Sequence, residues 1–440
     1  MDAHKLTLSE ASRLIRLGEL SPSELLESLL CRIDRLEPRI QAWVTLDREG
    51  AREAAERLTR EAEEGLFRGP LHGMPVGIKD IYYTMGLKTT MGSPLYRDFE
   101  PTYDAATVAR LREAGAIILG KTETTEFAAT DPAPTRNPWN IEHTPGGSSS
   151  GSAAAVSSGM CPAALGTQTG GSVIRPAAYC GVVGMKPTYD LISRRGVYPL
   201  SWSLDHVGFF ARSVDDASIM LDVLAGSELE HSKMTVDRPS FYRFGLLREY
   251  FQDNAHEGVW KGFEEAIDRL SDAGAEVFEV PLPNSFGVVH AAHRVVMASE
   301  AASVHEENFK KRGSDYRVKI RGHIASGLLV PASAYIRAQR IRGRFMRETT
   351  QLLGEVDCIL TPPATTPAPR GLGYTGDPAF NVPWSFSGLP SMTVPSGLDK
   401  DGLPLGIQLT CEPFQEALLI GAARWCEGVL GFTKYPRDPV

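Results

Sequence analysis

Two glycine-rich loops lie close together near the middle of the chain and constrain its fold more than any other feature. Residues 144–152 form a glycine and serine loop that runs into an alanine-rich stretch typical of a tightly packed helix. Residues 163–166 predict a strand, and a second glycine-rich turn follows over residues 167–172. A helical turn over residues 176–181 has proline near its start and glycine after its end. Glycine lets the backbone turn sharply and pack closely, so we expect tight backbone contacts here.

Capped helices and a helix–strand alternation precede these loops. Residues 7–10 and 21–24 are capping boxes that mark the starts of two helices, and the second helix carries a leucine stripe. Residues 74–80 predict a short strand that ends in charged side chains. Residues 105–114 predict a helix and residues 116–120 a buried strand. This alternation indicates an α/β protein.

The rest of the chain predicts no separate domain. Residues 290–350 are expected to be mostly helical, and strands return at 358–360, 391–394 and 405–409. We see neither an internal repeat nor a linker, so one domain over residues 1–440 is the simplest account. Its expected parts are N-terminal helices packing on the core (1–65), a catalytic core (69–225), a variable, mostly helical region (228–350) and a return to the core sheet (351–440).

Composition excludes several classes of partner. The 440 residues are 42% hydrophobic and 23% charged, with a net charge of -8, so no basic surface for nucleic acid or an anionic membrane is expected. No apolar run is long enough for a transmembrane helix, and the first residues predict no secretory signal. The scattered cysteines predict buried thiols in a reducing compartment, by default the cytoplasm, rather than disulfides or a zinc site. They are Cys31, Cys161, Cys180, Cys358, Cys411 and Cys426.

The second glycine-rich turn suggests acyl-transfer chemistry. Consecutive N–H groups that point to one place stabilise an oxyanion, and Ser172 stands at the end of such a turn. The candidate donors are the backbone N–H groups of Thr169, Gly170, Gly171 and Ser172. Taken alone, the same Gly-Gly-Ser is also typical of an ordinary tight turn.

Serine needs a base to become a nucleophile, and the histidine candidates are weak. His206 follows Asp205 directly, and sequence neighbours do not face each other as a triad requires. Residues 290–293 read His-Ala-Ala-His without a third metal ligand nearby, so no metal site is predicted. Residues 147–151 match G-x-S-x-G, but residues 141–145 are a poor central strand, which argues against a nucleophile elbow. No phosphate-binding loop with its basic residue is present.

Lys79 provides a better base. Residues 77–80 (Gly-Ile-Lys-Asp), 146–152 and 166–172 occur in an order and at spacings that resemble the amidase signature family. The resemblance continues through residues 180–188, 203–208, 388–391 and 402–409. It implies a single α/β domain whose large mixed sheet is covered by helices on both faces. It also implies hydrolysis of a carboxylic amide to an acid and ammonia or an amine.

The resemblance implies a Ser-Ser-Lys triad without a metal or organic cofactor. Ser172 would be the nucleophile, and Ser148, after a cis Gly147–Ser148 peptide, would link it to Lys79. A lysine acts as a base only when neutral, and its usual pKa is about 10.4. Burial at the end of an apolar strand would lower that pKa, so the physics agrees with the assignment.

Two departures from the family bear on the substrate. Position 168 is Gln where much of the family has Asp, and Arg175 stands one place later than the corresponding arginine of many members. Both features are similar to the malonamidase branch, which implies that Arg175 pairs with the carboxylate of a small, malonamate-like substrate. Arg175 could equally pair with an internal acid and only brace the loop.

Three other functions remain open. The first is the glutaminase subunit of a tRNA-dependent amidotransferase, against which we weigh the short C-terminus and the displaced Arg175. The second is a catalytically silent binding or scaffold protein on the same fold, and the third is an esterase. The expected partner is a small-molecule amide, with neither nucleic acid nor membrane, and the first two helices could serve a homodimer.

Overall fold

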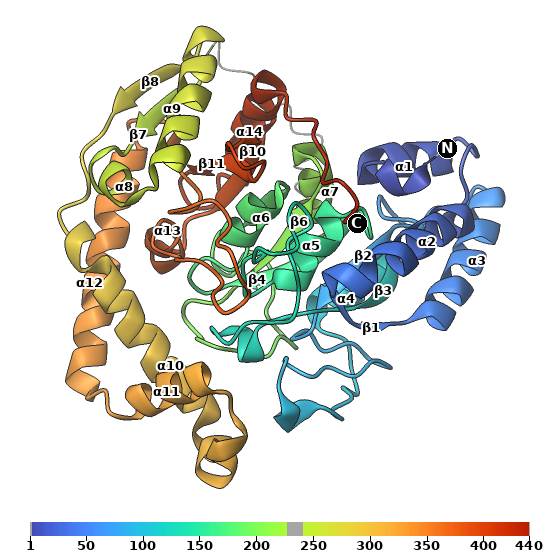
Figure 1. The fold of residues 1–440 in the computed structure, drawn as a ribbon, viewed down its shortest axis with the longest axis horizontal. Coiled ribbons are helices and arrows are strands. Elements are labelled where there is room, and N and C mark those ends of the chain that lie inside the picture. The colour runs from blue at the N-terminus through green and yellow to red at the C-terminus, as the bar shows by residue number, and fades with distance from the viewer. Residues whose placement is uncertain (1, 227–240, 440) are drawn as a thin grey trace.

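The strands of the chain form one mixed sheet with 11 strands (Figure 1). The computed structural model describes residues 2–226 and 241–439. In order across the sheet, the strands are β1 (Trp43–Leu46), β3 (Ile117–Thr122), β2 (Pro75–Lys79), β4 (Ala163–Gln168), β6 (His206–Ala211), β5 (Val183–Lys186), β10 (Ser391–Leu398), β11 (Pro404–Thr410), β9 (Cys358–Thr361), β7 (Arg243–Leu246) and β8 (Glu276–Glu279).

Two parallel groups are joined by antiparallel strands. Strand β2 pairs in parallel with both β3 and β4, and β7 pairs in parallel with β8 and β9. The pairs between β4 and β9 across the sheet are antiparallel. Every residue of β2, β3 and β4 is buried, as expected for parallel strands covered on both faces. The predicted mixed sheet is therefore confirmed.

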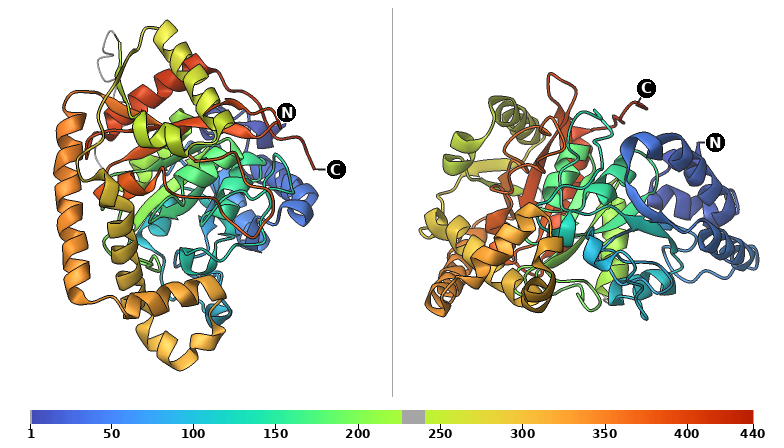
Figure 2. Two further views of the ribbon diagram at one scale, coloured as in Figure 1. Left: turned by 60° about the vertical axis from the view of Figure 1, so that its left-hand side comes forward. Right: turned by 60° about the horizontal axis from the view of Figure 1, so that its bottom comes forward.

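Helices cover both faces of this sheet (Figure 2). A first core is formed with α2 (Pro22–Ile40), α3 (Arg48–Glu63), α5 (Ser150–Ser157) and α6 (Ile174–Cys180). The larger second core includes α1 (Leu8–Arg16), α4 (Ala106–Glu113), α7 (Val214–Ala225), α8 (Glu249–Asn254), α9 (Glu257–Asp272) and α14 (Glu416–Leu430). Both predicted capping boxes are present, at the starts of α1 and α2.

A helical arm lies beside the half of the sheet that carries β7, β8 and β9 (Figure 1). It consists of α10 (Val289–Arg312), α11 (Val318–Leu328) and α12 (Ala332–Leu353), and the short α13 (Val382–Ser387) packs against α10 and α12. The helices predicted over residues 290–350 are therefore confirmed. Residues 228–240 of the predicted variable region lie outside the described residues. Short 3₁₀ turns occur at Ala3–Lys5, Pro94–Tyr96, Glu126–Ala128, Phe286–Val288 and Gly313–Asp315.

One prediction about the cysteines is wrong. Cys31 is exposed, because it lies on the side of α2 away from the buried Leu29, Leu30 and Ile33. The other five cysteines are buried, and all six are free thiols. Among the described residues, no helix is both long and apolar enough to cross a membrane.

Candidate active site

Lys79 is the last residue of strand β2, which lies between β3 and β4, and it is fully buried. Strands β2 and β4 run in parallel, so their carboxyl ends reach the same edge of the sheet. Strand β4 continues there into residues 169–172, which we call the nucleophile turn and which lead into α6. In open α/β sheets this edge is where ligands bind.

The Lys79 amine touches two hydroxyl groups. Its Nζ lies 2.7 Å from Ser148 Oγ and 2.8 Å from Thr167 Oγ1. Burial holds the pKa of Lys79 well below its usual value, and the charge of Asp205 opposes this by raising it. An amine whose neutral form is favoured by burial therefore lies within hydrogen-bonding distance of a serine hydroxyl, the arrangement a proton relay needs.

Ser148 lies in the first glycine-rich loop, directly before α5. The peptide bond between Gly147 and Ser148 is cis, as the resemblance implies. Ser148 is buried, and its carbonyl accepts a hydrogen bond from the backbone N–H of Thr125 at 3.2 Å. Helix α5, which follows, is buried along its whole length and packs against β2, β3 and β4. This packing fixes the loop against the sheet.

The nucleophile turn is tightly enclosed, and Ser172 is its last residue, 9% exposed. A Cβ atom on Gly171 would lie 2.4 Å from Asn381 Oδ1, so only glycine fits at this point. Among residues 2–226 and 241–439, no group accepts a hydrogen bond from the N–H groups of Gly170, Gly171 and Ser172. These donors are free to bind an oxyanion.

Asp205 holds the start of the same turn. Its Oδ1 accepts a hydrogen bond of 2.6 Å from Thr169 Oγ1. Its Oδ2 accepts bonds from the backbone N–H groups of Leu200, at 2.8 Å, and Ser201, at 2.9 Å. Burial raises the pKa of the Asp205 carboxyl, and these bonds lower it. Both oxygens act as acceptors, as in the ionised form.

Arg175 joins the two glycine-rich loops. Its Nη2 donates to the Gly147 carbonyl at 2.7 Å and lies 3.5 Å from Thr375 Oγ1. Its Nε and Nη1 are buried without a hydrogen-bond partner in the described part of the chain. The pairing with an internal acid that we considered is absent among the described side chains, where Arg175 forms no ion pair. Arg175 therefore braces the segment after Ser172 against the peptide before Ser148.

The histidines form neither of the sites we considered and rejected. Nδ1 of His206 lies 2.7 Å from the Leu204 carbonyl oxygen, and Asp205 bonds to Thr169 rather than to the His206 ring. His290 and His293 each have Nε2 close to a backbone carbonyl oxygen. No group of three metal-ligating side chains occurs within the described ranges.

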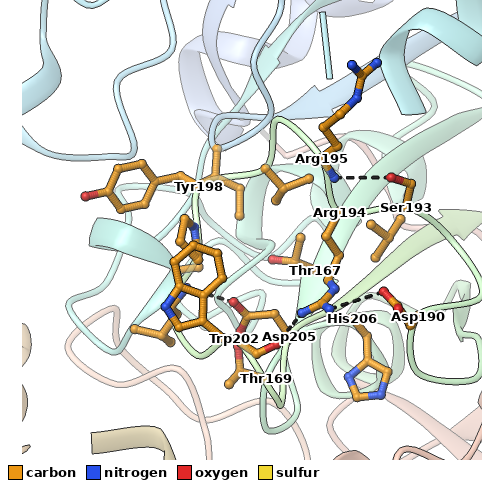
Figure 3. Close-up of a pocket in the computed structure, with 16 residues that line it drawn as sticks. Thr167, Thr169, Asp190, Ser193, Arg194, Arg195, Tyr198, Trp202, Asp205 and His206 are labelled. Atoms are coloured by element: carbon orange, nitrogen blue, oxygen red, sulfur yellow. Dashed lines mark hydrogen bonds and ion pairs between the residues drawn. The ribbon is translucent and has the colours of Figure 1, made fainter. Parts of the chain in front are cut away.

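A cavity of about 310 Å³ opens beside the nucleophile turn and includes Thr167 and Thr169 in its lining (Figure 3). Arg194 and Arg195 also line it, and Arg194 donates a hydrogen bond to the carbonyl oxygen of Trp202. Two aromatic side chains, those of Tyr198 and Trp202, line the cavity. Phe209, Phe210, Phe380, Trp384 and Phe386 are buried in the core.

The mixed sheet with its covering helices and its glycine-rich loops defines the amide hydrolases of the amidase class. The chain belongs to this family: the family model described as Amidase matches residues 24–420. The predicted resemblance is thus confirmed, and the chain is an enzyme that acts on C–N amide bonds. The malonamidase branch remains a prediction.

Known relatives extend over nearly the whole chain. A glutamyl-tRNA(Gln) amidotransferase subunit from Roseiflexus sp. (strain RS-1) is 37% identical over 464 residues, covering 95% of this chain and 95% of its own. A crystal structure described as an amidase has a TM-score of 0.89 at 33% identity, covering 96% of this chain and 99% of its own. The native peptide amidase from Stenotrophomonas maltophilia has a TM-score of 0.84 at 30% identity, covering 99% of both chains.

Proposed function

We propose that this chain hydrolyses amides through an acyl-enzyme on Ser172, with Ser148 as relay and Lys79 as base. The observation that carries the proposal is the 2.7 Å contact between Lys79 Nζ and Ser148 Oγ in a fully buried site. The bond from Arg175 to the Gly147 carbonyl supports the remaining step, because it ties the Ser172 segment to the Ser148 loop.

The first half of the reaction forms the acyl-enzyme. Neutral Lys79 takes the proton of Ser148 as Ser148 takes the proton of Ser172. Ser172 Oγ attacks the amide carbonyl, and the resulting oxyanion binds to the free N–H groups of the nucleophile turn. The protonated relay then gives a proton to the leaving nitrogen, the C–N bond breaks, and ammonia or an amine departs.

The second half returns the free enzyme. Water takes the place of the leaving group and gives a proton to the same relay as it attacks the acyl carbonyl. The second oxyanion uses the same N–H groups. Its collapse breaks the bond to Ser172, whose Oγ takes back the proton held by the relay, and releases the acid. In this proposal the three side chains carry every proton transfer of the cycle.

For the substrate we place the side-chain amide of glutamine first. The support is the name shared by relatives at 35–37% identity, which are glutamyl-tRNA(Gln) amidotransferase subunits, and this outweighs the displaced Arg175. As part of such an assembly, the chain would release ammonia for its partner proteins to use. Malonamate is the second candidate, favoured by the unpartnered Nε and Nη1 of Arg175.

A hydrolysis screen tests both the reaction and the substrate. It compares ammonia release from glutamine, malonamate, aliphatic amides and aryl amides, with Ser172→Ala as the blank. Activity on at least one amide that disappears in Ser172→Ala supports the proposal. A chain that cleaves none of them and gives no serine adduct would favour the silent scaffold instead, and preference for esters would favour an esterase.

A further inference from the structure

The first carbonyl of the nucleophile turn is held by a histidine from the helical arm. Nε2 of His293, on α10, lies 3.0 Å from the carbonyl oxygen of Thr169. A carbonyl oxygen only accepts, so Nε2 carries the proton. Burial lowers the pKa of His293 to about 4, so the ring stays neutral near pH 7 and needs no counter-charge.

The second carbonyl of the turn is held by a serine from another helix. Ser385 Oγ, on α13, lies 2.7 Å from the carbonyl oxygen of Gly170 and donates to it. The same hydroxyl lies 3.0 Å from Nε2 of Gln168. The Oε1 of Gln168 accepts from the backbone N–H groups of Val173 and Ile174.

These contacts fix the direction of each hydrogen bond. Two backbone donors face Oε1 of Gln168, so its NH₂ group faces Ser385 and donates to the hydroxyl oxygen. The single proton of Ser385 is then left for the Gly170 carbonyl. The Gln168 amide therefore sets the direction in which Ser385 donates.

Peptide geometry converts these bonds into an arrangement of donors. In a planar trans peptide, the C=O of one residue points opposite to the N–H of the next. Holding the Thr169 carbonyl toward α10 turns the Gly170 N–H away from it, and holding the Gly170 carbonyl toward α13 does the same for the Gly171 N–H. The two helices lie on the same side of the turn, since the His293 ring lies 6.0 Å from that of Phe386.

We propose that His293 and Ser385 are positioning residues that fix two successive peptide groups of the nucleophile turn, so that Gly170 and Gly171 present their N–H groups together to the oxyanion. This inference rests on the proposed Ser172 mechanism. Donors that are already oriented stabilise the transition state without reorganising during the reaction. The helical arm thus acts on the site by holding a carbonyl of the turn rather than by contacting the substrate.

A fluorophosphonate measures this effect without knowledge of the natural amide. Ser172 Oγ would bond to phosphorus as fluoride leaves, and the serine proton would pass to the Ser148 and Lys79 relay. The phosphoryl oxygen gains negative charge in the transition state, where the turn N–H groups would stabilise it. The second-order rate of inactivation by an alkyl fluorophosphonate therefore reports on the donors.

Three variants should slow this inactivation at least about 10-fold, because one lost oxyanion donor lowers rates by about 10²–10³. They are His293→Leu, Ser385→Ala and Gln168→Glu. In Gln168→Glu, a carboxylate would accept the Ser385 proton and draw it from the Gly170 carbonyl. His293→Gln, which keeps an N–H donor, should recover most of the rate.

Matched controls come from the same two helices. His290→Leu removes the contact of another α10 histidine with a carbonyl, that of Ala379. Ser387→Ala removes a hydroxyl of α13 that donates to the Pro383 carbonyl. Both should be inactivated at close to the wild-type rate.

The outcomes separate this inference from the proposed function. If wild type is not inactivated, or if the fluorophosphonate labels Ser172→Ala equally well, the proposed function fails and the inference with it. If wild type reacts at Ser172 but Ser385→Ala and His293→Leu react as fast, only the inference is overturned. A His293→Gln rate as low as that of His293→Leu would also overturn it, since packing alone would then explain the loss. Should His293→Leu not fold, Ser385→Ala and Gln168→Glu decide.

Discussion

At the scale of the residue, we predict that the charge of Asp205 and the burial of Lys79 together set the pH range of the enzyme. Burial lowers the pKa of Lys79, and the Asp205 charge raises it. Lysine acts as base only when neutral, so activity should rise as the pH passes the pKa of Lys79. The negative charge of Asp205 favours protonated Lys79 and so holds this rise at higher pH.

Asp205→Asn should therefore move the acidic limb of the kcat/KM profile to lower pH. The substitution removes the charge but keeps an oxygen acceptor for the backbone N–H groups of Leu200 and Ser201. Asp190→Asn is the matched control, since Asp190 lines the same cavity and pairs with Arg194 at 3.2 Å. An unmoved limb, or one moved to higher pH, would contradict the role given to Asp205.

Arg175→Ala separates a substrate contact from a bracing role. If Nε and Nη1 bind a substrate carboxylate, malonamate should lose about 10- to 100-fold more kcat/KM than a neutral amide, as expected for charged hydrogen bonds of about 1.5–3 kcal/mol. If Arg175 only holds the Gly147 carbonyl, both substrates should lose equally. Parallel kinetics on malonamate and propionamide decide between them.

At the scale of the elements, a carboxylate anchors the N-terminal helices. Asp216, on α7, accepts hydrogen bonds of 2.9 Å from the backbone N–H groups of both Leu8 and Ser9 at the start of α1. Asp216 is fully buried, while its neighbour Asp215 is exposed and pairs with Arg424. The two positions therefore make a matched pair.

Asp216→Ala should lower the free energy of unfolding by about 1–3 kcal/mol, since it leaves one buried and one partly buried backbone donor unpaired. Asp215→Ala should change it by less than about 1 kcal/mol, as expected for a surface ion pair. Urea unfolding gives both values, and hydrogen exchange at Leu8 and Ser9 should speed up in the first variant alone. Equal unfolding midpoints would refute the anchor.

The predicted elements match the structure where the sequence has a clear period or cap. Helices α1 and α2 begin at the capping boxes predicted over residues 7–10 and 21–24, and the strand predicted over residues 74–80 is β2. Strands β5 and β6 were missed. They have only four and six residues, and these residues show no alternation of apolar and polar side chains that would mark a strand. Their pairing with each other and with β10 and β4 depends on distant chain segments, which local patterns do not encode.

Part of the site was also predictable. The motif order identified Lys79 and Ser148, and the structure places them in contact. The roles of His293 and Ser385 were missed. His293 lies in the variable region 228–350, outside the family motifs, and neither residue belongs to a glycine-rich loop. Their contacts join residues 124 and 215 positions apart in sequence, and only the folded chain brings them together.

At the scale of the whole molecule, the chain matches an amidase in length and fold. That it works as part of a larger assembly is a prediction. If it works within a tRNA-dependent amidotransferase, which the name of its relatives supports, the tagged chain should co-purify with the other proteins of that assembly. Its release of ammonia from glutamine should then change when those proteins are added. A chain that purifies alone, ignores glutamine and cleaves malonamate would favour the second candidate. Size-exclusion chromatography of the pure chain tests the predicted homodimer.

The nucleophile is tested most directly by mapping the fluorophosphonate adduct on the full-length protein by mass spectrometry. The account predicts one adduct per chain, on the peptide that contains Ser172, and none in Ser172→Ala. Lys79→Met should keep the fold and form the adduct at least about 10³-fold more slowly, because its base is gone. An adduct on Ser148, or undiminished labelling without the Lys79 amine, would contradict the account.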